Sequence, residues 1–121
     1  FTSCRAICPV LSNSFAALQR DAGAGVTVIS VSIDPEFDTP QVLQNYARRF
    51  SAGPSWRFLT GRAKDIVAVQ RAFGAYPGEK NAHQPLTFLR RAGSHEWIRL
   101  TGFPSTDQML GELNMEGAPA R

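Results

Sequence analysis

One stretch decides the fold: VTVISVSIDPEFDTP, residues 26–40. Its first half, Val26 to Ile33, is a β-branched run without helical periodicity, which predicts a strand buried on both faces of a parallel sheet. The pair Asp34-Pro35 ends that strand. Thr39 can then cap a helix whose first residue is Pro40, where the missing N–H costs no hydrogen bond. A buried strand that passes through a short turn into a helix indicates an α/β protein.

Helices and strands alternate on both sides of this stretch. Before it, Leu11, Phe15 and Leu18 recur with helical spacing, so we expect a helix over about residues 9–22. After it, periodicity and turn residues predict a helix from 40, a strand over 56–59, a helix over 63–73, a hairpin of 86–89 with 97–100, and a capped helix from 105. This order predicts a thioredoxin-like α/β sandwich, in which helices flank a mixed sheet.

The length and composition fit one domain over residues 1–121. Apolar residues make up 43% of the 121 residues and charged residues 19%, which suits an ordered core better than a disordered chain. A thioredoxin-like sheet also needs a strand that runs into the loop containing Cys4. An open central position would expose unpaired backbone, so we expect that strand upstream of Phe1, together with a signal or membrane anchor.

Basic residues are dispersed along the chain. The net charge is +3, and the thirteen Lys and Arg residues occur singly or as the pairs Arg48-Arg49 and Arg90-Arg91. A nucleic-acid partner is not expected, because nucleic-acid binding needs a concentrated basic stripe with interleaved aromatic residues. A mildly basic surface favours encounter with an acidic protein instead. No run of about 20 apolar residues is present, so contact with a membrane is expected only through a segment outside this chain.

Cys4 and Cys8 form a Cys-x3-Cys pair that Pro9 follows directly. Pro9 belongs in the first turn of a helix, which places Cys8 at the helix cap and Cys4 in the loop before it. The N–H groups and the dipole at a helix N-terminus favour thiolate over thiol, and thiolates act as nucleophiles and as soft metal ligands. The spacing also permits a disulfide, but so short a loop gains little stability from one. Redox or metal chemistry is therefore favoured, and an inert structural pair is the alternative.

His83 lies in a polar segment before the predicted hairpin and is followed by Gln84-Pro85. In thioredoxin-like folds this loop passes beside the cysteine loop, commonly with a cis-proline, a role for which Pro85 is placed. His83 would then reach the cysteine pocket. Two thiolates and an imidazole suit copper as Cu(I) or Cu(II), whereas a structural zinc site takes four protein ligands. His95, after the hairpin turn, is expected on the surface.

Two motifs resemble those of the Sco/SenC family. Phe1-Thr2-Ser3-Cys4-x3-Cys8-Pro9 is similar to the signature Phe-Thr-x-Cys-x3-Cys-Pro, and residues 32–40 are similar to the segment Ser-x-Asp-Pro-x-x-Asp-Thr-Pro. The resemblance extends to about Leu100. It implies a copper-binding metallochaperone, with Cys4, Cys8 and His83 as ligands, that helps to assemble the binuclear copper site of cytochrome c oxidase. Its expected partners are an oxidase subunit or another copper chaperone.

The resemblance also implies a place for the protein and a class of activity. The family's domain is held at the outer face of a membrane, so we expect a periplasmic or otherwise extracytoplasmic protein. A carrier is expected more than a turnover enzyme.

Two departures from the family pattern favour a second function. Arg5 stands where many members have proline, and Pro85 where many have an aliphatic residue. Arg5 would stabilise a thiolate, and a cis-proline would shield the cysteines from metal. Both features favour a thiol–disulfide oxidoreductase that acts on a partner's cysteines through Cys4 and Cys8. Peroxide reduction through Cys4 is a third class that the fold permits.

Three further residues have two interpretations each. Asp34 is either an acid that supports the cysteines or only the end of a strand. Trp56 and Trp97 are expected in the core or the sheet rather than at a binding site.

Overall fold

The computed structural model describes residues 7–76 and 86–113, and of residues 7, 8 and 24 it describes the backbone alone. Helices and strands alternate in these ranges, as the sequence predicts. The elements in chain order are α1 (Ile7–Ala22), the 3-10 turn η1 (Gly23–Gly25), β1 (Val28–Val31), α2 (Pro40–Arg49), β2 (Trp56–Leu59), α3 (Ala63–Ala72), β3 (Leu86–Leu89), β4 (Ile98–Thr101) and α4 (Thr106–Glu112).

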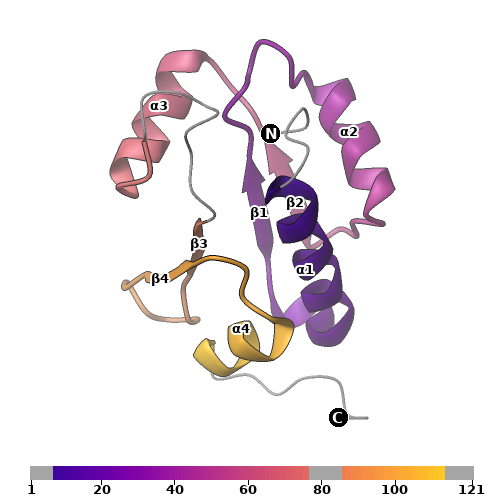
Figure 1. Cartoon of the computed structure of the whole chain (residues 1–121), viewed down its shortest axis with the longest axis vertical. Coiled ribbons are helices and arrows are strands. Elements are labelled where there is room, and N and C mark those ends of the chain that lie inside the picture. The colour runs from indigo at the N-terminus through magenta and orange to yellow at the C-terminus, as the bar shows by residue number, and fades with distance from the viewer. Residues whose placement is uncertain (1–6, 77–85, 114–121) are drawn as a thin grey trace.

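The strands form two pairs. β1 and β2 are parallel, with Val28 opposite Trp56, and α2 makes the crossover connection that a parallel pair requires. β3 and β4 form the predicted antiparallel hairpin, with Phe88 opposite Arg99. Within the described ranges the two pairs are separate sheets. Figure 1 shows α2 on one side of the β1–β2 pair and α3 with the hairpin on the other.

The helix ends follow from capping residues. The Thr39 hydroxyl accepts a hydrogen bond from the Val42 N–H at 3.3 Å, and the Ser105 hydroxyl accepts one from the Gln108 N–H at 3.1 Å. These bonds satisfy donors that have no partner inside the helix. α3 ends before Gly74, whose φ of +66° is strained for any residue with a Cβ. The predicted starts of α2 and α4 and the end of α3 are therefore confirmed.

The core lies where α1 and α4 pack on the strands. Its least exposed apolar side chains are Leu18, Met109 and Leu110, with exposed fractions of 2%, 0% and 0%. Trp56 belongs to this core, where its ring stacks on Phe58 at 4.9 Å between centroids. The prediction that Trp56 is a core residue is confirmed.

Three predictions about burial are wrong. β1 is shorter than expected and is not buried on both faces, since Ile29 on the face opposite Val28 is 56% exposed. The spacing of Ile66, Val69 and Phe73 predicts that these three residues share the inward side of α3, but Val69 is 41% exposed. Trp97 is 50% exposed because β4 begins one residue after it, which leaves its ring at the edge of the hairpin.

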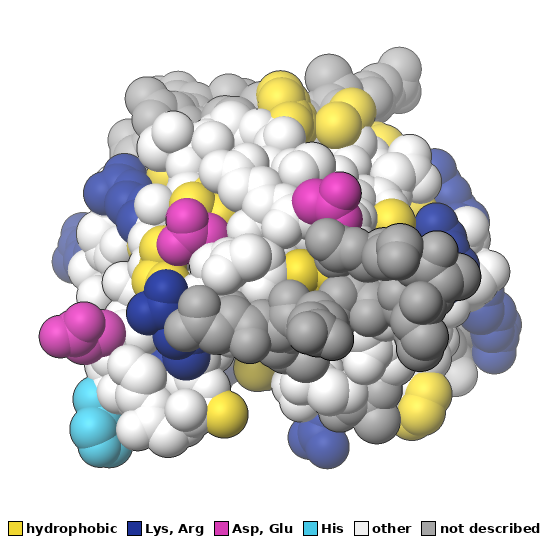
Figure 2. Space-filling model, turned by 90° about the horizontal axis from the view of Figure 1, so that it is seen from below, with side chains coloured by type: hydrophobic (Ala, Val, Ile, Leu, Met, Phe, Trp, Pro, Cys, Tyr) yellow, Lys and Arg dark blue, Asp and Glu magenta, His cyan; other side chains and the backbone are white. Residues whose placement is uncertain are grey.

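Charged side chains are spread over the surface. Figure 2 shows the molecule from below, with dark-blue Lys and Arg side chains on both sides of this face and no continuous stripe of them across it. His95 is exposed, as predicted. None of the described helices is long and apolar enough to cross a membrane.

Candidate functional site

Cys8 is the predicted site residue that the structure places, and it does so by its backbone. It is the second residue of α1, which begins two residues earlier than the sequence indicated, so Cys8 lies inside the first turn and not at the cap. Pro9 fits there because the N–H groups of a first turn have no partner within the helix. The other residues predicted to shape the site lie outside the described ranges: Cys4, Arg5, His83 and Pro85.

The first turn of α1 is a favourable place for sulfur chemistry. It is the N-terminal end of a helix of 16 residues, whose dipole and N–H groups favour a negatively charged side chain. A cysteine in such a position ionises more readily and becomes a better nucleophile and metal ligand. Within residues 7–76 and 86–113, no three His, Cys, Asp or Glu residues are grouped so that they could hold a metal ion.

The first turn of α1 and the carboxyl end of β1 lie at the same end of the molecule, because the two elements run in opposite directions (Figure 1). The turn that leaves β1, residues 32–39, begins at this end. Functional loops of α/β proteins gather at the carboxyl ends of parallel strands. The turn after β1 is therefore a described loop at the same end of the molecule as Cys8.

A buried hydrogen-bond network holds this turn. The Ser32 hydroxyl donates to the Asp38 carboxylate at 2.6 Å and accepts from the Asp34 N–H at 3.0 Å. The Asp38 N–H in turn donates to the Asp34 carbonyl at 2.8 Å. Asp38 is 0% exposed, and Ser32 and Asp34 are almost as buried. The network ties the end of β1 to the start of α2.

The network bears on the two interpretations of Asp34. Its backbone N–H and carbonyl both take part in the turn, which is what a strand-ending residue does. Its role as an acid that supports the cysteines stays a prediction. Sequence reasoning missed Ser32 and Asp38. The signal was there: a serine at the end of a strand expected to be buried needs a hydrogen-bond partner.

Removing the Ser32 hydroxyl tests the network. We expect Ser32→Ala to lower the free energy of unfolding by about 1.5–3 kcal/mol, because a buried charged acceptor loses a donor. Ser14→Ala is the matched control, since that hydroxyl makes an exposed bond of 3.3 Å to the Val10 carbonyl. Urea unfolding followed by circular dichroism measures both. Equal losses in the two variants would contradict the importance of the network.

A second buried polar contact braces the same helix. The hydroxyl oxygens of Ser12 in α1 and Tyr46 in α2 lie 3.0 Å apart, and both residues are buried. Ser12 follows Cys8 by four residues, so the two share a face of α1. This contact fixes α1 against α2 one turn below Cys8. The spacing of Leu43, Tyr46 and Phe50 in the sequence predicts an inward Tyr46, and a buried tyrosine hydroxyl usually has a hydrogen-bond partner.

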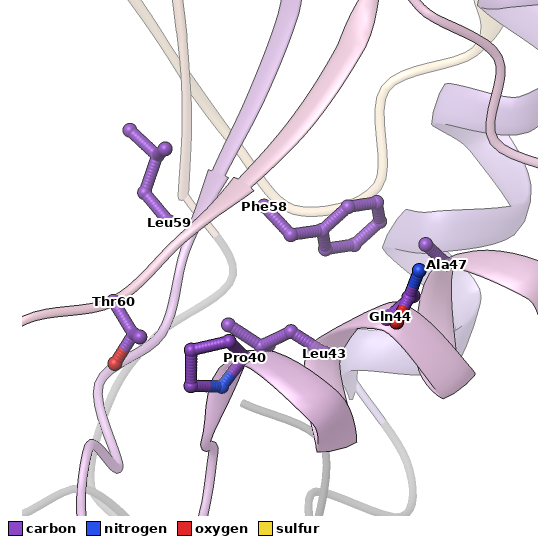
Figure 3. A pocket seen from close by; sticks show the side chains of 7 residues that line it. All are labelled: Pro40, Leu43, Gln44, Ala47, Phe58, Leu59 and Thr60. Carbon is purple, nitrogen blue, oxygen red and sulfur yellow. The ribbon is translucent and has the colours of Figure 1, made fainter.

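The structure also has a pocket of about 370 Å³ between α2 and β2. Figure 3 shows its lining: Pro40, Leu43, Gln44 and Ala47 from α2, with Phe58, Leu59 and Thr60 from β2 and the residue after it. Phe58 points across toward α2, whereas Leu59 points to the other side of the strand. The lining is mainly apolar and contains no Cys or His. This pocket therefore does not supply ligands for a metal.

The profile of the SCO1/SenC family matches residues 1–92 of the chain. The chain belongs to the SCO1/SenC family. The match includes both cysteines, the turn after β1 and the segment with His83. The resemblance drawn from the two motifs is confirmed.

Curated members of the SCO1/SenC family are similar over part of their length. The SCO1 protein homolog of Bacillus subtilis (strain 168) is 38% identical over 71 residues, which are 55% of this chain and 37% of that protein. Protein SenC of Rhodobacter capsulatus is 33% identical over 92 residues, 74% of this chain and 41% of that protein. The chain thus spans less than half the length of either relative.

Solved SCO1/SenC structures share the fold. A SCO1/SenC family lipoprotein from Bacillus anthracis str. Ames has a TM-score of 0.80 at 23% identity, over 94% of this chain and 75% of that one. Arabidopsis thaliana ScoI with copper bound has a TM-score of 0.73 at 25% identity, over 94% and 78%. The predicted thioredoxin-like α/β fold is confirmed.

Proposed function

We propose that the protein binds copper through Cys4, Cys8 and His83 and delivers it to the binuclear copper site of cytochrome c oxidase. The observation that carries the proposal is the position of Cys8 in the first turn of α1, within the family motif. Copper in the solved Arabidopsis thaliana ScoI supports the choice of metal. The metal is cargo, so the protein acts as a carrier and not as a turnover enzyme.

The chemistry of the three side chains suits this cargo. Thiolate sulfur is a soft ligand that selects Cu(I), and an imidazole nitrogen also accommodates Cu(II). A thiol in the first turn of α1 loses its proton more readily, so less free energy is needed to release that proton when a metal binds.

The proposal includes a place and partners. We propose an extracytoplasmic protein that is attached to a membrane through a segment outside this chain. The lipoprotein nature of the Bacillus anthracis relative supports this location. The partners that exchange copper with the protein are an oxidase subunit or another copper chaperone.

Removal of His83 tests the ligand set. We expect the reduced protein to compete with a Cu(I) chelator for one copper ion. His83→Ala should weaken binding by about tenfold or more, since even residues that only support a ligand contribute about 10- to 100-fold. His95→Ala is the matched control because His95 is exposed. A wild-type protein that takes up no copper, or a His83→Ala variant with unchanged affinity and Cu(II) absorption, would refute the proposal.

The second candidate is a thiol–disulfide reductant of a partner's cysteines. The position of Cys8 at a helix N-terminus supports it as well, and Arg5 and Pro85 favour it in the sequence. In that reaction a Cys4 or Cys8 thiolate attacks the partner's disulfide, and the second cysteine releases the reduced partner as a Cys4–Cys8 disulfide forms. Metal-free protein should then equilibrate with glutathione. Absence of exchange would exclude this role.

A further inference from the structure

A cluster of aromatic rings is exposed where α3 meets the hairpin. The Phe73 ring packs against Phe88 of β3 at 4.9 Å between centroids and against Trp97 at 5.0 Å in an edge-to-face arrangement. Trp97 nevertheless keeps 50% of its surface open to solvent. A tryptophan that is fixed on one side and open on the other is a feature of binding surfaces.

Arginines surround these rings. The Arg90 guanidinium lies 5.5 Å from the centre of the Trp97 ring, within the range of a cation–π contact. Arg99 is exposed on β4 directly opposite Phe88, so it lies on the same face of the hairpin. We call Phe73, Phe88, Arg90, Trp97 and Arg99 the hairpin patch. In the last turn of α3, the Arg71 guanidinium lies 4.9 Å from the centre of the Tyr76 ring and adds another cation beside an exposed ring.

The charge of the hairpin patch is positive and is not neutralised within the described part of the chain. Glu96 precedes Trp97 and is the acid nearest to it in sequence. The salt bridge found among the described residues joins Arg62 to Asp65, at the other end of α3. The Arg90 guanidinium donates to the Ser94 carbonyl at 3.2 Å, and no carboxylate of residues 7–76 or 86–113 forms an ion pair with it.

We propose that the hairpin patch is a docking surface for an acidic segment of a partner protein. Trp and Arg are the residues in which binding energy concentrates at protein interfaces. Carboxylates on the partner would pair with Arg90 and Arg99 while an apolar side chain covers the indole. A second copy of this chain fits poorly, because two surfaces of the same positive charge repel each other.

The position of the hairpin patch relates the docking to the proposed copper site. β3 begins three residues after His83 in the sequence, so a partner bound to the patch is held close to the segment that contains the distal copper ligand. In this respect the inference rests on the proposed function. The docking itself needs no metal and is testable without it.

The two tryptophans provide the readout. Metal-free, reduced, isotope-labelled protein is titrated with a short peptide of alternating Glu and Leu, and the indole N–H resonances are followed by NMR. We expect the Trp97 resonance to shift in a saturable and salt-sensitive way. The Trp56 resonance is an internal control and should stay in place, because that indole is buried and donates to Ser30 at 3.0 Å.

Charge-removing variants locate the binding surface. The double variant Arg90→Gln/Arg99→Gln should lose about two- to thirtyfold in affinity for the peptide, as two exposed charge pairs contribute 0.2–1 kcal/mol each. Arg48→Gln removes one charge from α2, on the far side of the β1–β2 pair, and should leave the affinity unchanged (Figure 1).

Several outcomes would overturn the inference. They are an unmoved Trp97 resonance, equal binding of a peptide of Lys and Leu, and tighter binding of single-stranded DNA or phosphatidylglycerol vesicles than of the acidic peptide. A wild-type protein that binds the peptide but no copper would refute the proposed function alone. A protein that binds copper but fails the peptide test would refute the docking surface alone.

Discussion

Replacing Leu110 with alanine is expected to lower the free energy of unfolding by about 2–5 kcal/mol. Leu110 is 0% exposed and packs in the core cluster with Leu18, Trp56 and Met109. Truncation removes buried methyl groups and leaves a cavity. Because α4 is held against α1, it can move only a little to fill that cavity. Urea unfolding, followed by the fluorescence of Trp56 and Trp97, measures the loss.

Leu59→Ala is the matched control for this variant. Leu59 is 45% exposed at the end of β2, and the same substitution there should cost less than about 1 kcal/mol. Equal costs at the two positions would contradict the placement of the core between α1, α4 and the strands. If the Leu110→Ala protein does not fold, Leu110→Met tests the same site, since a swap that conserves volume costs less than about 1.5 kcal/mol.

Replacing either Cys4 or Cys8 with serine is expected to reduce copper affinity more than about a hundredfold. Serine keeps the shape of the side chain but replaces soft sulfur with a hard oxygen, which Cu(I) binds poorly. The estimate is a lower limit, because supporting residues outside the ligand set already contribute about 10- to 100-fold. Chelator competition under reducing conditions measures the affinity.

Counting the reactive thiols provides a control for the serine variants. After mild oxidation the wild-type protein should show no reactive thiol if Cys4 and Cys8 form a disulfide, and each variant should show one. Serine at these positions should leave the unfolding curve nearly unchanged, because a disulfide that closes so short a loop contributes little stability. Serine variants that still bound copper as tightly as the wild type would refute the ligand assignment.

Local signals in the sequence predicted most of the described fold. Thr39 and Ser105 marked helix starts because a side-chain oxygen must satisfy the first N–H groups, and the structure shows both bonds. Gly74 marked a helix end because only glycine takes a positive φ without strain. Such signals depend on a few neighbouring residues, so they are readable without tertiary structure.

Burial was predicted less well because it depends on partners far along the chain. Ile29 is part of a β-branched run that resembles a strand buried on both faces, yet one face of β1 is open in the described part of the chain. The same reason explains why the Ser12–Tyr46 contact was missed. It joins α1 to α2 across 34 residues, and nothing in the local sequence identifies the second residue of the pair.

The same difference between local and long-range signals applies to the candidate site. The position of Cys8 at the start of α1 followed from Pro9 alone, to within two residues. His83 was selected from the expected fold and the family resemblance, since a single histidine in a polar segment carries no periodic signal. Its role is therefore the part of the site that most needs the copper measurements.

The contact between Phe73 and Phe88 closes the intervening chain into a loop, with one ring directly after α3 and the other on β3. Bringing the two ends of such a loop together lowers its conformational entropy. Because the aromatic contact forms when the chain folds, this conformational entropy is lost before any metal binds. His83 belongs to the closed segment in sequence, so the proposed copper binding would have fewer conformations of the chain left to restrict, and we expect a higher affinity for the metal than without the contact.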